Sequence, residues 1–154
     1  MRTNFLARLR FRPLVVGGLF CFGLVLAKTG FAEGALLKLQ VQGIRDDSGS
    51  LRVSLYREPE SFRKEERAFK LISQPARKGE VTLAFDDVPP GRYAIMAYHD
   101  ENNDGKLNLR LGMFPQEGYA LSNNPQVIGP PRFNDSAFDF PATDGSVLRL
   151  DLKY

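Results

Sequence analysis

Short runs in which apolar and polar residues alternate constrain the fold of this chain more than any other feature of its sequence. A period of two places every second side chain on one face of a β-strand, so each run predicts a strand with one buried face. Residues 92–98 are more continuously apolar and predict a central strand. Several short strands separated by turn residues predict an all-β domain, an antiparallel β-sandwich of two sheets. The alternating runs are residues 37–42, 51–56, 81–85, 137–140 and 147–152.

The connections between these runs carry three further predictions. The turn cluster at 46–49 joins the first two runs and predicts a β-hairpin over residues 36–56. Residues 59–69 lack alternation, Pro59 suits a first helical position, and Phe62 and Phe69 share one face, so one short helix is expected there. The segment 99–131 is rich in Asn, Gly and Pro. Its apolar residues predict a long ordered loop, which is where a site would lie.

The first 32 residues differ from the rest of the chain. Four arginines precede an apolar stretch from Pro13 to Ala27, and Gly30 and Ala32 place small residues before a cleavage site. This order is that of a secretory signal peptide. The stretch is shorter than the ~20 residues of a membrane-spanning helix, so cleavage after Ala32 is expected, with an uncleaved membrane anchor as the alternative. The prediction is a signal peptide over 1–32 and a single periplasmic or secreted domain over 33–154.

Removal of the signal peptide reverses the charge of the chain. The whole sequence has 21 basic and 18 acidic residues, a net charge of +3. Five basic residues and no acidic ones lie within 1–32, which leaves 16 and 18, a net charge of −2. No excess of cations remains to neutralise phosphates, so a nucleic-acid partner is not expected. Cys21 is the only cysteine and is lost with the signal peptide, so disulfides and thiolate chemistry are not expected.

Oxygen-bearing side chains open the long loop with the spacing of the first half of a calcium loop. Leu111 stands at the twelfth position, where a bidentate Glu belongs, so a weak site is expected unless Glu117 or Asp135 supplies a carboxylate. The alternative is a turn whose Asp and Asn side chains hydrogen-bond their own backbone. The candidate Ca²⁺ ligands are Asp100, Asn102, Asp104, Lys106 through its carbonyl, and Asn108.

The loop also holds candidates for contact with a ligand. His99, the only histidine, follows the central strand beside Asp100, an arrangement that suits a general base. No second histidine and no nucleophile motif accompanies it, so no catalytic residue is predicted. The alternative for the whole set is that it satisfies buried backbone groups. The predicted ligand-binding residues are His99, Glu117, Tyr119, Ser122 and Asn123.

Three motifs give the chain a family resemblance. They are DVPPGRY at 87–93, YHDENNDGKL at 98–107 and EGYALSNN at 117–124. Together they resemble a family of exported bacterial proteins known as domain of unknown function 2141. The resemblance covers essentially the whole mature chain. It implies a secreted or periplasmic β-sandwich similar to transthyretin-like and carboxypeptidase-regulatory-like domains, and it implies no established activity.

These observations favour a function without catalysis. We expect a binding or accessory module of the cell envelope that contacts an envelope protein or a small ligand through the 99–131 face. Calcium is the only candidate cofactor, and no stable membrane span is expected after signal removal. The alternatives are a hydrolase-type enzyme that uses His99 with Asp100 or Glu117, and a purely structural domain whose long loop covers the core.

Overall fold

The chain folds almost entirely into short strands, as a computed structural model of residues 34–143 and 147–154 shows. The predicted signal peptide and its cleavage site lie outside the described residues. The strands are β1 (Ala35–Ile44), β2 (Ser50–Tyr56), β3 (Lys70–Pro75), β4 (Gly79–Val88), β5 (Gly91–Asp100), β6 (Leu109–Arg110), β7 (Phe114–Pro115), β8 (Tyr119–Leu121), β9 (Phe138–Phe140) and β10 (Val147–Asp151). The helical turns are η1 (Pro59–Ser61), η2 (Glu65–Arg67) and α1 (Phe133–Ser136).

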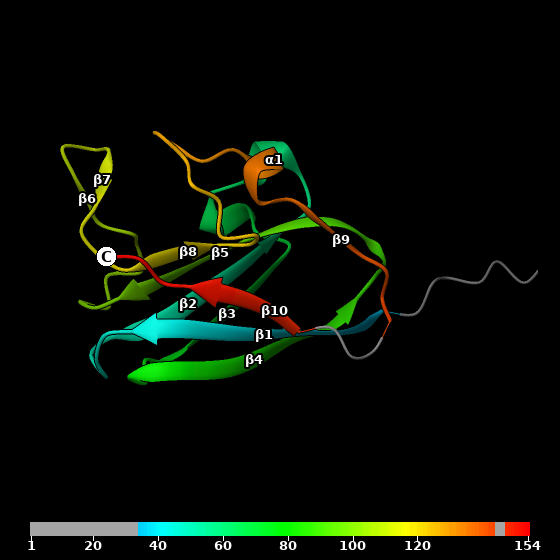
Figure 1. Cartoon of the computed structure of the whole chain (residues 1–154), viewed down its shortest axis with the longest axis horizontal. Helices are drawn as coiled ribbons and strands as arrows, with labels where there is room; N and C mark the ends of the chain where they lie inside the picture. Colours follow the sequence, from blue (N-terminus) through cyan, green and yellow to red (C-terminus); the bar gives the residue numbers. More distant parts are fainter. Residues whose placement is uncertain (1–33, 144–146) are drawn as a thin grey trace, which may run out of the picture.

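Two sheets face each other. One has the strand order β10-β1-β4, and the other has the order β3-β2-β5-β8, with β9 also paired to β5. They form the two layers of an open sandwich, which confirms the predicted fold class (Figure 1). One pairing departs from an antiparallel sandwich, because β10 runs parallel to β1, with Val41 opposite Leu150.

The predicted hairpin over residues 36–56 is wrong. β1 pairs with β4 and β10, whereas β2 pairs with β3 and β5, so the two runs lie in different sheets. Alternation predicts that each strand has one apolar face but does not say which sheet the strand joins. Because β1 and β2 lie in opposite layers, their apolar faces pack against each other in one core. The connection passes tightly over the end of β5, because a side chain at Gly49 would collide with the carbonyl of Asp100.

The short helix predicted over 59–69, a turn or two covering the sheet, is present as two separate 3₁₀ turns, η1 and η2. The α-helix of the described residues, α1, lies elsewhere in the chain. Arg63 lies between the two turns with a φ of 66°, a left-handed conformation that ends any right-handed helix. The edge strand β3 follows and was not predicted, because only Leu71 and Ile72 within it are apolar.

The segment 99–131 is ordered but is not free of strands. β5 extends through His99 and Asp100, and the hairpin β6–β7 and the strand β8 follow. The hairpin stands clear of both sheets (Figure 1). β8 pairs with β5 through residues 119–121 and completes the second sheet.

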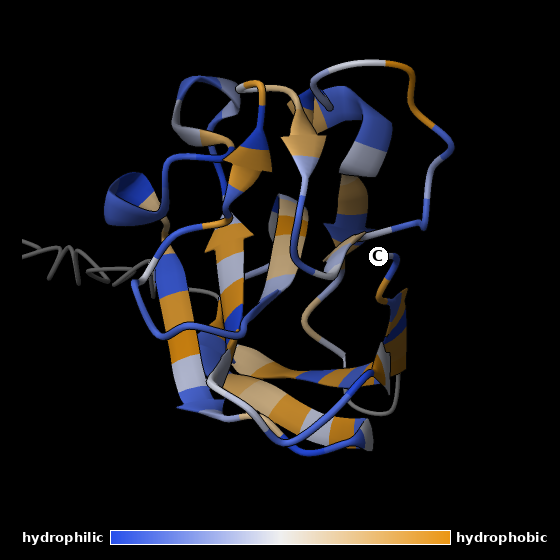
Figure 2. Ribbon diagram, turned by 90° about the vertical axis from the view of Figure 1, so that its left-hand side faces the viewer, coloured by the Kyte–Doolittle hydropathy of each residue, from blue (hydrophilic) through white to orange (hydrophobic). Residues whose placement is uncertain are grey.

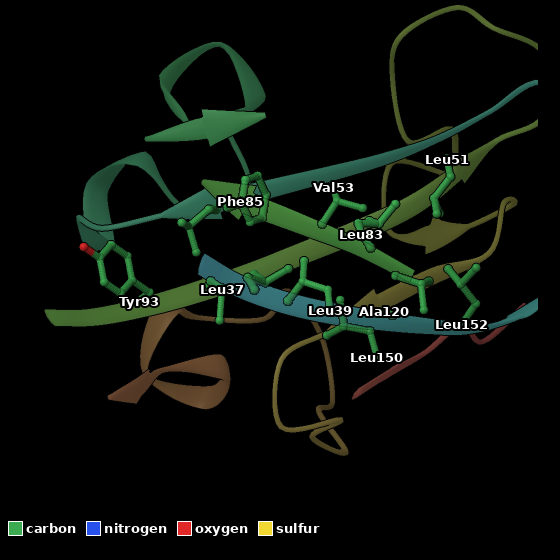
Figure 3. Packing of buried hydrophobic residues seen from close by; sticks show 14 of the residues in the cluster. Leu37, Leu39, Leu51, Val53, Leu83, Phe85, Tyr93, Ala120, Leu150 and Leu152 are labelled. Carbon is green, nitrogen blue, oxygen red and sulfur yellow. The ribbon is translucent and has the colours of Figure 1, made fainter. Parts of the chain in front are cut away.

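The main core lies between the two sheets. Its side chains come from β1, β2, β4, β5, β8 and β10, as the labelled sticks in Figure 3 show. Bands of hydrophobic and hydrophilic residues alternate along the strands in Figure 2, so the period of two in the sequence marks the buried face. The fully or almost fully buried members include Leu37, Leu39, Val41, Leu51, Val53, Leu55, Val88, Tyr93, Ile95, Ala97 and Leu150.

A second, smaller apolar cluster lies on the outer face of the second sheet. The ring of Phe62 packs edge-on against Tyr56 at 5.3 Å and against Phe133 at 6.0 Å, measured between ring centroids. Ala94 and Leu121 complete the buried part of this cluster. The sheet β3-β2-β5-β8 therefore has apolar side chains on both faces. Part of this cluster also lines the candidate site, namely Tyr56, Met96, Tyr119 and Val127.

Candidate functional site

An apolar cleft of about 660 Å³ lies over the outer face of β2, β5 and β8. Its floor consists of strand residues, and its walls come from the turn around 63–66, the segment 105–115 and the segment 127–131. Most of the walls therefore belong to the long segment 99–131. The floor residues are Ser54, Tyr56, Met96, Tyr98 and Tyr119.

A polar cleft of about 450 Å³ lies on the other side of the loop 100–105, against the ends of β2 and β3. It is shallower and more open than the apolar cleft, and its lining is mostly polar, with Arg52, Ser73 and Asp104 among its residues. Small-molecule sites are typically enclosed and lined mainly by apolar and aromatic side chains. The apolar cleft meets this description, and the polar cleft does not.

The loop after β5 is held by hydrogen bonds from its own backbone. The buried carboxylate of Asp100 accepts the amides of Asp104 at 3.1 Å and Gly105 at 2.9 Å. Oδ1 of Asn102 accepts the amide of Asp104, and Oδ1 of Asp104 accepts the amide of Lys106. The pKa of Asp104 is lowered, first because Asn108 donates a side-chain hydrogen bond to it at 2.9 Å. These contacts have the form of the Asx turn that was the alternative to a calcium loop.

The five predicted calcium ligands lie in this one loop, and Glu117 lies beside them. The two oxygens of its buried carboxylate accept the amide of Glu101 at 3.1 Å and that of Asn108 at 2.9 Å. Asp135, the other carboxylate considered, instead accepts the amide of Arg132 and caps α1. Within residues 34–143 and 147–154, no three His, Cys, Asp or Glu side chains converge as a metal-binding group. Glu117 thus acts as a clamp that joins the two ends of the loop.

His99 is fully buried, and both of its ring nitrogens are engaged. Nε2 lies 2.7 Å from the carbonyl of Ser48, which can only accept, so Nε2 carries the proton. In the neutral imidazole, Nδ1 then accepts from the hydroxyl of Tyr154 at 2.8 Å, and that hydroxyl in turn accepts the amide of Arg45 at 3.0 Å. The side chain lies at the end of the sandwich and does not line the apolar cleft. This arrangement leaves no free nitrogen to act as a base.

The second polar cluster ties the long segment to the sandwich. Oγ of Ser122 accepts the amide of Ile95 at 2.8 Å, and Asn123 donates to the carbonyl of Ala137 at 2.8 Å. Asn124 exchanges hydrogen bonds with the backbone and side chain of Asp151 on β10. Asn123 and Asn124 have positive φ angles, which asparagine tolerates better than most residues. Their polar atoms are therefore used inside the protein.

Of the predicted ligand-binding residues, the structure places only Tyr119 along the cleft. The floor residues Tyr56, Met96 and Tyr98 were missed by sequence reasoning. A signal for them exists in the continuous apolar run at 92–98, because a strand with apolar side chains on both faces needs cover on both. Nothing in the sequence says which segment provides that cover.

One polar network reaches the cleft floor. The hydroxyl of Tyr98 donates to Oε2 of Glu65 at 3.0 Å, and the guanidinium of Arg52 binds the same carboxylate. Burial raises the pKa of Tyr98, and burial also raises the pKa of Tyr56 to about 12. Both phenols are therefore neutral at physiological pH, and the turn η2 is held onto β2 and β5 by this network.

Comparison with known families supports the motifs noted in the sequence. The family model described as an uncharacterized protein conserved in bacteria (DUF2141) matches residues 39–147. The chain belongs to the DUF2141 family. No curated protein and no solved structure matches it. Among the described residues of this DUF2141 protein, no helix has the length and apolar character needed to cross a membrane.

Proposed function

We propose that this DUF2141 protein is an exported, non-enzymatic binding module of the cell envelope and that its site is the apolar cleft. The observation that carries the proposal is the cleft itself, with a volume of about 660 Å³ and an aromatic floor. That volume lies within the range of about 300–1,000 Å³ that is usual for small-molecule sites. The cleft is walled by the 99–131 face, and export rests on the signal-peptide pattern in residues 1–32.

The state of the candidate catalytic side chains supports a binding module without catalytic activity. His99 uses both ring nitrogens within the protein, and the carboxylates of Asp100 and Glu117 accept backbone amides. Glu101 and Asp46 are the carboxylates nearest to the imidazole, at 3.8 and 3.9 Å, and Glu101 is bound by Arg45. A general base needs a free nitrogen within reach of substrate, and this imidazole offers none.

A ligand-observed NMR screen with small molecules of mixed chemistry tests whether the cleft binds. Leu109 lines the cleft and is 44% exposed, and Leu71 is equally exposed but lies on the edge strand β3 away from the cleft. Binders should be found, and Leu109→Asp should abolish their signals while Leu71→Asp retains them. Binding that survives Leu109→Asp would contradict the assignment of the site. Export is tested separately by the mass of the secreted chain, which should begin at Glu33.

Calcium is the second candidate ligand, and the position of Glu117 favours it. This residue brings a carboxylate to a loop that already holds the oxygen ligands of Asp100 and Asp104. Calcium would have to replace the hydrogen bonds that Asn102 and Asn108 donate to Asp104. It would also compete with the backbone amides that Asp100 and Glu117 accept, which is consistent with weak affinity. We propose that millimolar Ca²⁺ raises the melting temperature by mass action.

The calcium proposal is tested by thermal denaturation with and without Ca²⁺. Asp104→Ala should remove the shift. Asp46→Ala is the matched control, because Asp46 has a half-exposed side chain and also accepts the backbone amide of the residue two positions later, but it lies outside the loop. An unchanged melting temperature in the wild-type protein would end the calcium proposal and would leave the proposal for the cleft intact.

A further inference from the structure

One hydroxyl on the floor of the apolar cleft, that of Tyr98, is satisfied within the protein. The hydroxyl of Tyr98 donates to Glu65, and Glu65 is bound in turn by Arg52. In the part of the chain that the structure describes, the single buried side-chain oxygen or nitrogen without a partner is Oγ of Ser136, which does not line the cleft. A site built to recognise a polar ligand leaves polar groups that only the ligand satisfies. The hydroxyl of Tyr98 is not such a group, and among the described residues no fully buried side-chain group that lines the cleft is left without a partner.

The charges around the cleft do not favour one sign of ligand. Arg63 and Lys106 line it together with Glu66, and the fourth charged residue, Glu65, is paired with Arg52. Cations and an anion thus share the lining. Moving an ionised group of the ligand into such an apolar space without a dedicated partner is costly. This arrangement favours an uncharged occupant.

Exposed apolar side chains gather at the same place. Large apolar side chains are exposed at nine positions in the described residues, and four of these positions line the cleft. Scattered apolar residues on a surface are ordinary, whereas a gathered group marks a binding surface. The four are Leu109 at 44%, Met113 at 66%, Phe114 at 53% and Ile128 at 106% relative exposure.

We infer that the cleft holds an uncharged, largely apolar small molecule, selected by shape and burial and not by ion pairs. This inference rests on the proposed function, since it names the ligand class of the same site. The ligand lies on the aromatic floor formed by Tyr56, Tyr98 and Tyr119. The exposed apolar side chains of the hairpin β6–β7 and of Ile128 close over it.

Two fluorescent molecules with the same ring skeleton test the ligand class. N-phenyl-1-naphthylamine is uncharged, and 1-anilinonaphthalene-8-sulfonate adds one sulfonate to the same rings. Both gain fluorescence in apolar surroundings, so each can be titrated into the mature protein at moderate salt. The uncharged molecule should bind at least about tenfold more tightly, because the sulfonate finds no dedicated partner in the cleft.

Variants place that binding in the cleft. Leu109→Asp and Ile128→Asp should each weaken binding of the uncharged molecule by at least about tenfold, because each places a charge at the wall of the cleft. Leu71→Asp and Val147→Asp change exposed apolar residues outside the cleft and should leave its affinity unchanged. Two independent wall variants guard against local unfolding of the short β6–β7 hairpin in one of them.

The outcomes separate the two proposals. Equal or tighter binding of the sulfonate, lost in Leu109→Asp, would overturn the ligand class and leave the cleft as the site. Absence of binding by both molecules would overturn the ligand class, and the mixed-chemistry screen then decides the site. Analytical ultracentrifugation at the same protein concentrations tests whether the chain forms a dimer through the cleft. A dimer that Leu109→Asp dissociates would show that a second copy covers the cleft, and would overturn the inference.

Discussion

The two sheets of this sandwich share one core but differ in what covers their outer faces. On the sheet β10-β1-β4 the outer face is polar, and Gln40 and Gln42 donate hydrogen bonds across it to the exposed carboxylate of Glu80. On the sheet β3-β2-β5-β8 the outer face holds aromatic residues beneath the turns η1 and η2, the helix α1 and the segment 105–131. The sheet β10-β1-β4 needs no further cover on its outer face once the core is packed. The sheet β3-β2-β5-β8 needs a second layer of residues over its outer face, and a cleft can form where this layer is incompletely packed.

The largest expected effect comes from breaking the second layer. Phe62→Ala should lower the free energy of unfolding by about 3 kcal/mol, because it removes a buried ring that contacts two others. Phe69→Ala removes the same side chain from a position that is 39% exposed, and about 1 kcal/mol is expected. Urea denaturation measures both variants. Equal losses would mean that the outer cluster contributes no more than an ordinary surface contact.

Two glutamates offer a sharper comparison of the two faces. Glu117 and Glu80 each accept two hydrogen bonds, but Glu117 is 5% exposed and accepts from backbone amides, whereas Glu80 is exposed. Glu117→Gln turns an amide NH₂ toward a buried N–H donor, and a loss of about 2 kcal/mol is expected. Glu80→Gln should change the free energy of unfolding by less than about 0.5 kcal/mol. If Glu80→Gln lowered the free energy of unfolding as much as Glu117→Gln, burial of the carboxylate could not be the cause of the loss in stability.

The same contrast explains which parts of the fold could be predicted. Strands with one buried face alternate, so β1 and β10 were found close to their true bounds. β3 was missed because it is an edge strand with little apolar sequence. The partners of β1 and β2 were wrong because alternation specifies a face and not a neighbour. Pairing is decided by contacts between residues far apart in the sequence, such as Val41 with Val81 and with Leu150.

The candidate site was located by segment but not by residue. The composition of 99–131 predicted where a site would lie, and this segment supplies most of the cleft walls. Polar residues drew the prediction to His99 and Ser122, whose polar atoms satisfy the protein's own groups. Polar side chains in a long segment often serve to satisfy the backbone beneath it. The floor residues that were missed, Tyr56, Met96 and Tyr98, resemble core residues in the sequence, so only the three-dimensional arrangement distinguishes them from the core.

Tyrosine ionisation provides a smaller effect that reports on the covered face alone. Burial raises the pKa of Tyr56 from 10.0 to about 12. Since the folded pKa is higher than the unfolded one, this contribution to stability is fully present below pH 10 and is lost as the pH rises toward 12. Ultraviolet absorbance of the phenolate follows the titration, and Tyr56→Phe identifies the step that belongs to this residue.

The same titration can be combined with a change in the second layer. Phe62→Ala exposes the ring of Tyr56, so the ionisation assigned to Tyr56 should move from about 12 back toward 10.0. Glu80→Gln alters the opposite face and should leave this step in place. A step that stays near 12 in Phe62→Ala would show that the strands beneath, and not the second layer, keep water from the phenol.

The smallest expected effect concerns Asp104, which lines the polar cleft and is exposed to solvent. Its pKa is lowered from 3.8, first by the hydrogen bond from Asn108 and then by the amide of Lys106 and the side chain of Asn102. A lowered folded pKa gives a contribution to stability that is present above pH 3.8 and is lost as the pH falls through the folded pKa. Asn108→Ala should raise the pKa of Asp104 toward 3.8 in an NMR titration of its carboxylate.

The corresponding control is Ser48→Ala, which should raise the pKa of Asp46 and leave that of Asp104 unchanged, because Ser48 is the first cause of the lowered pKa at Asp46. If Asn108→Ala leaves the pKa of Asp104 where it was, the backbone amides alone fix this carboxylate. The conformation of the loop beside the cleft would then be set by its Asx turns and by the Glu117 clamp, without help from Asn108.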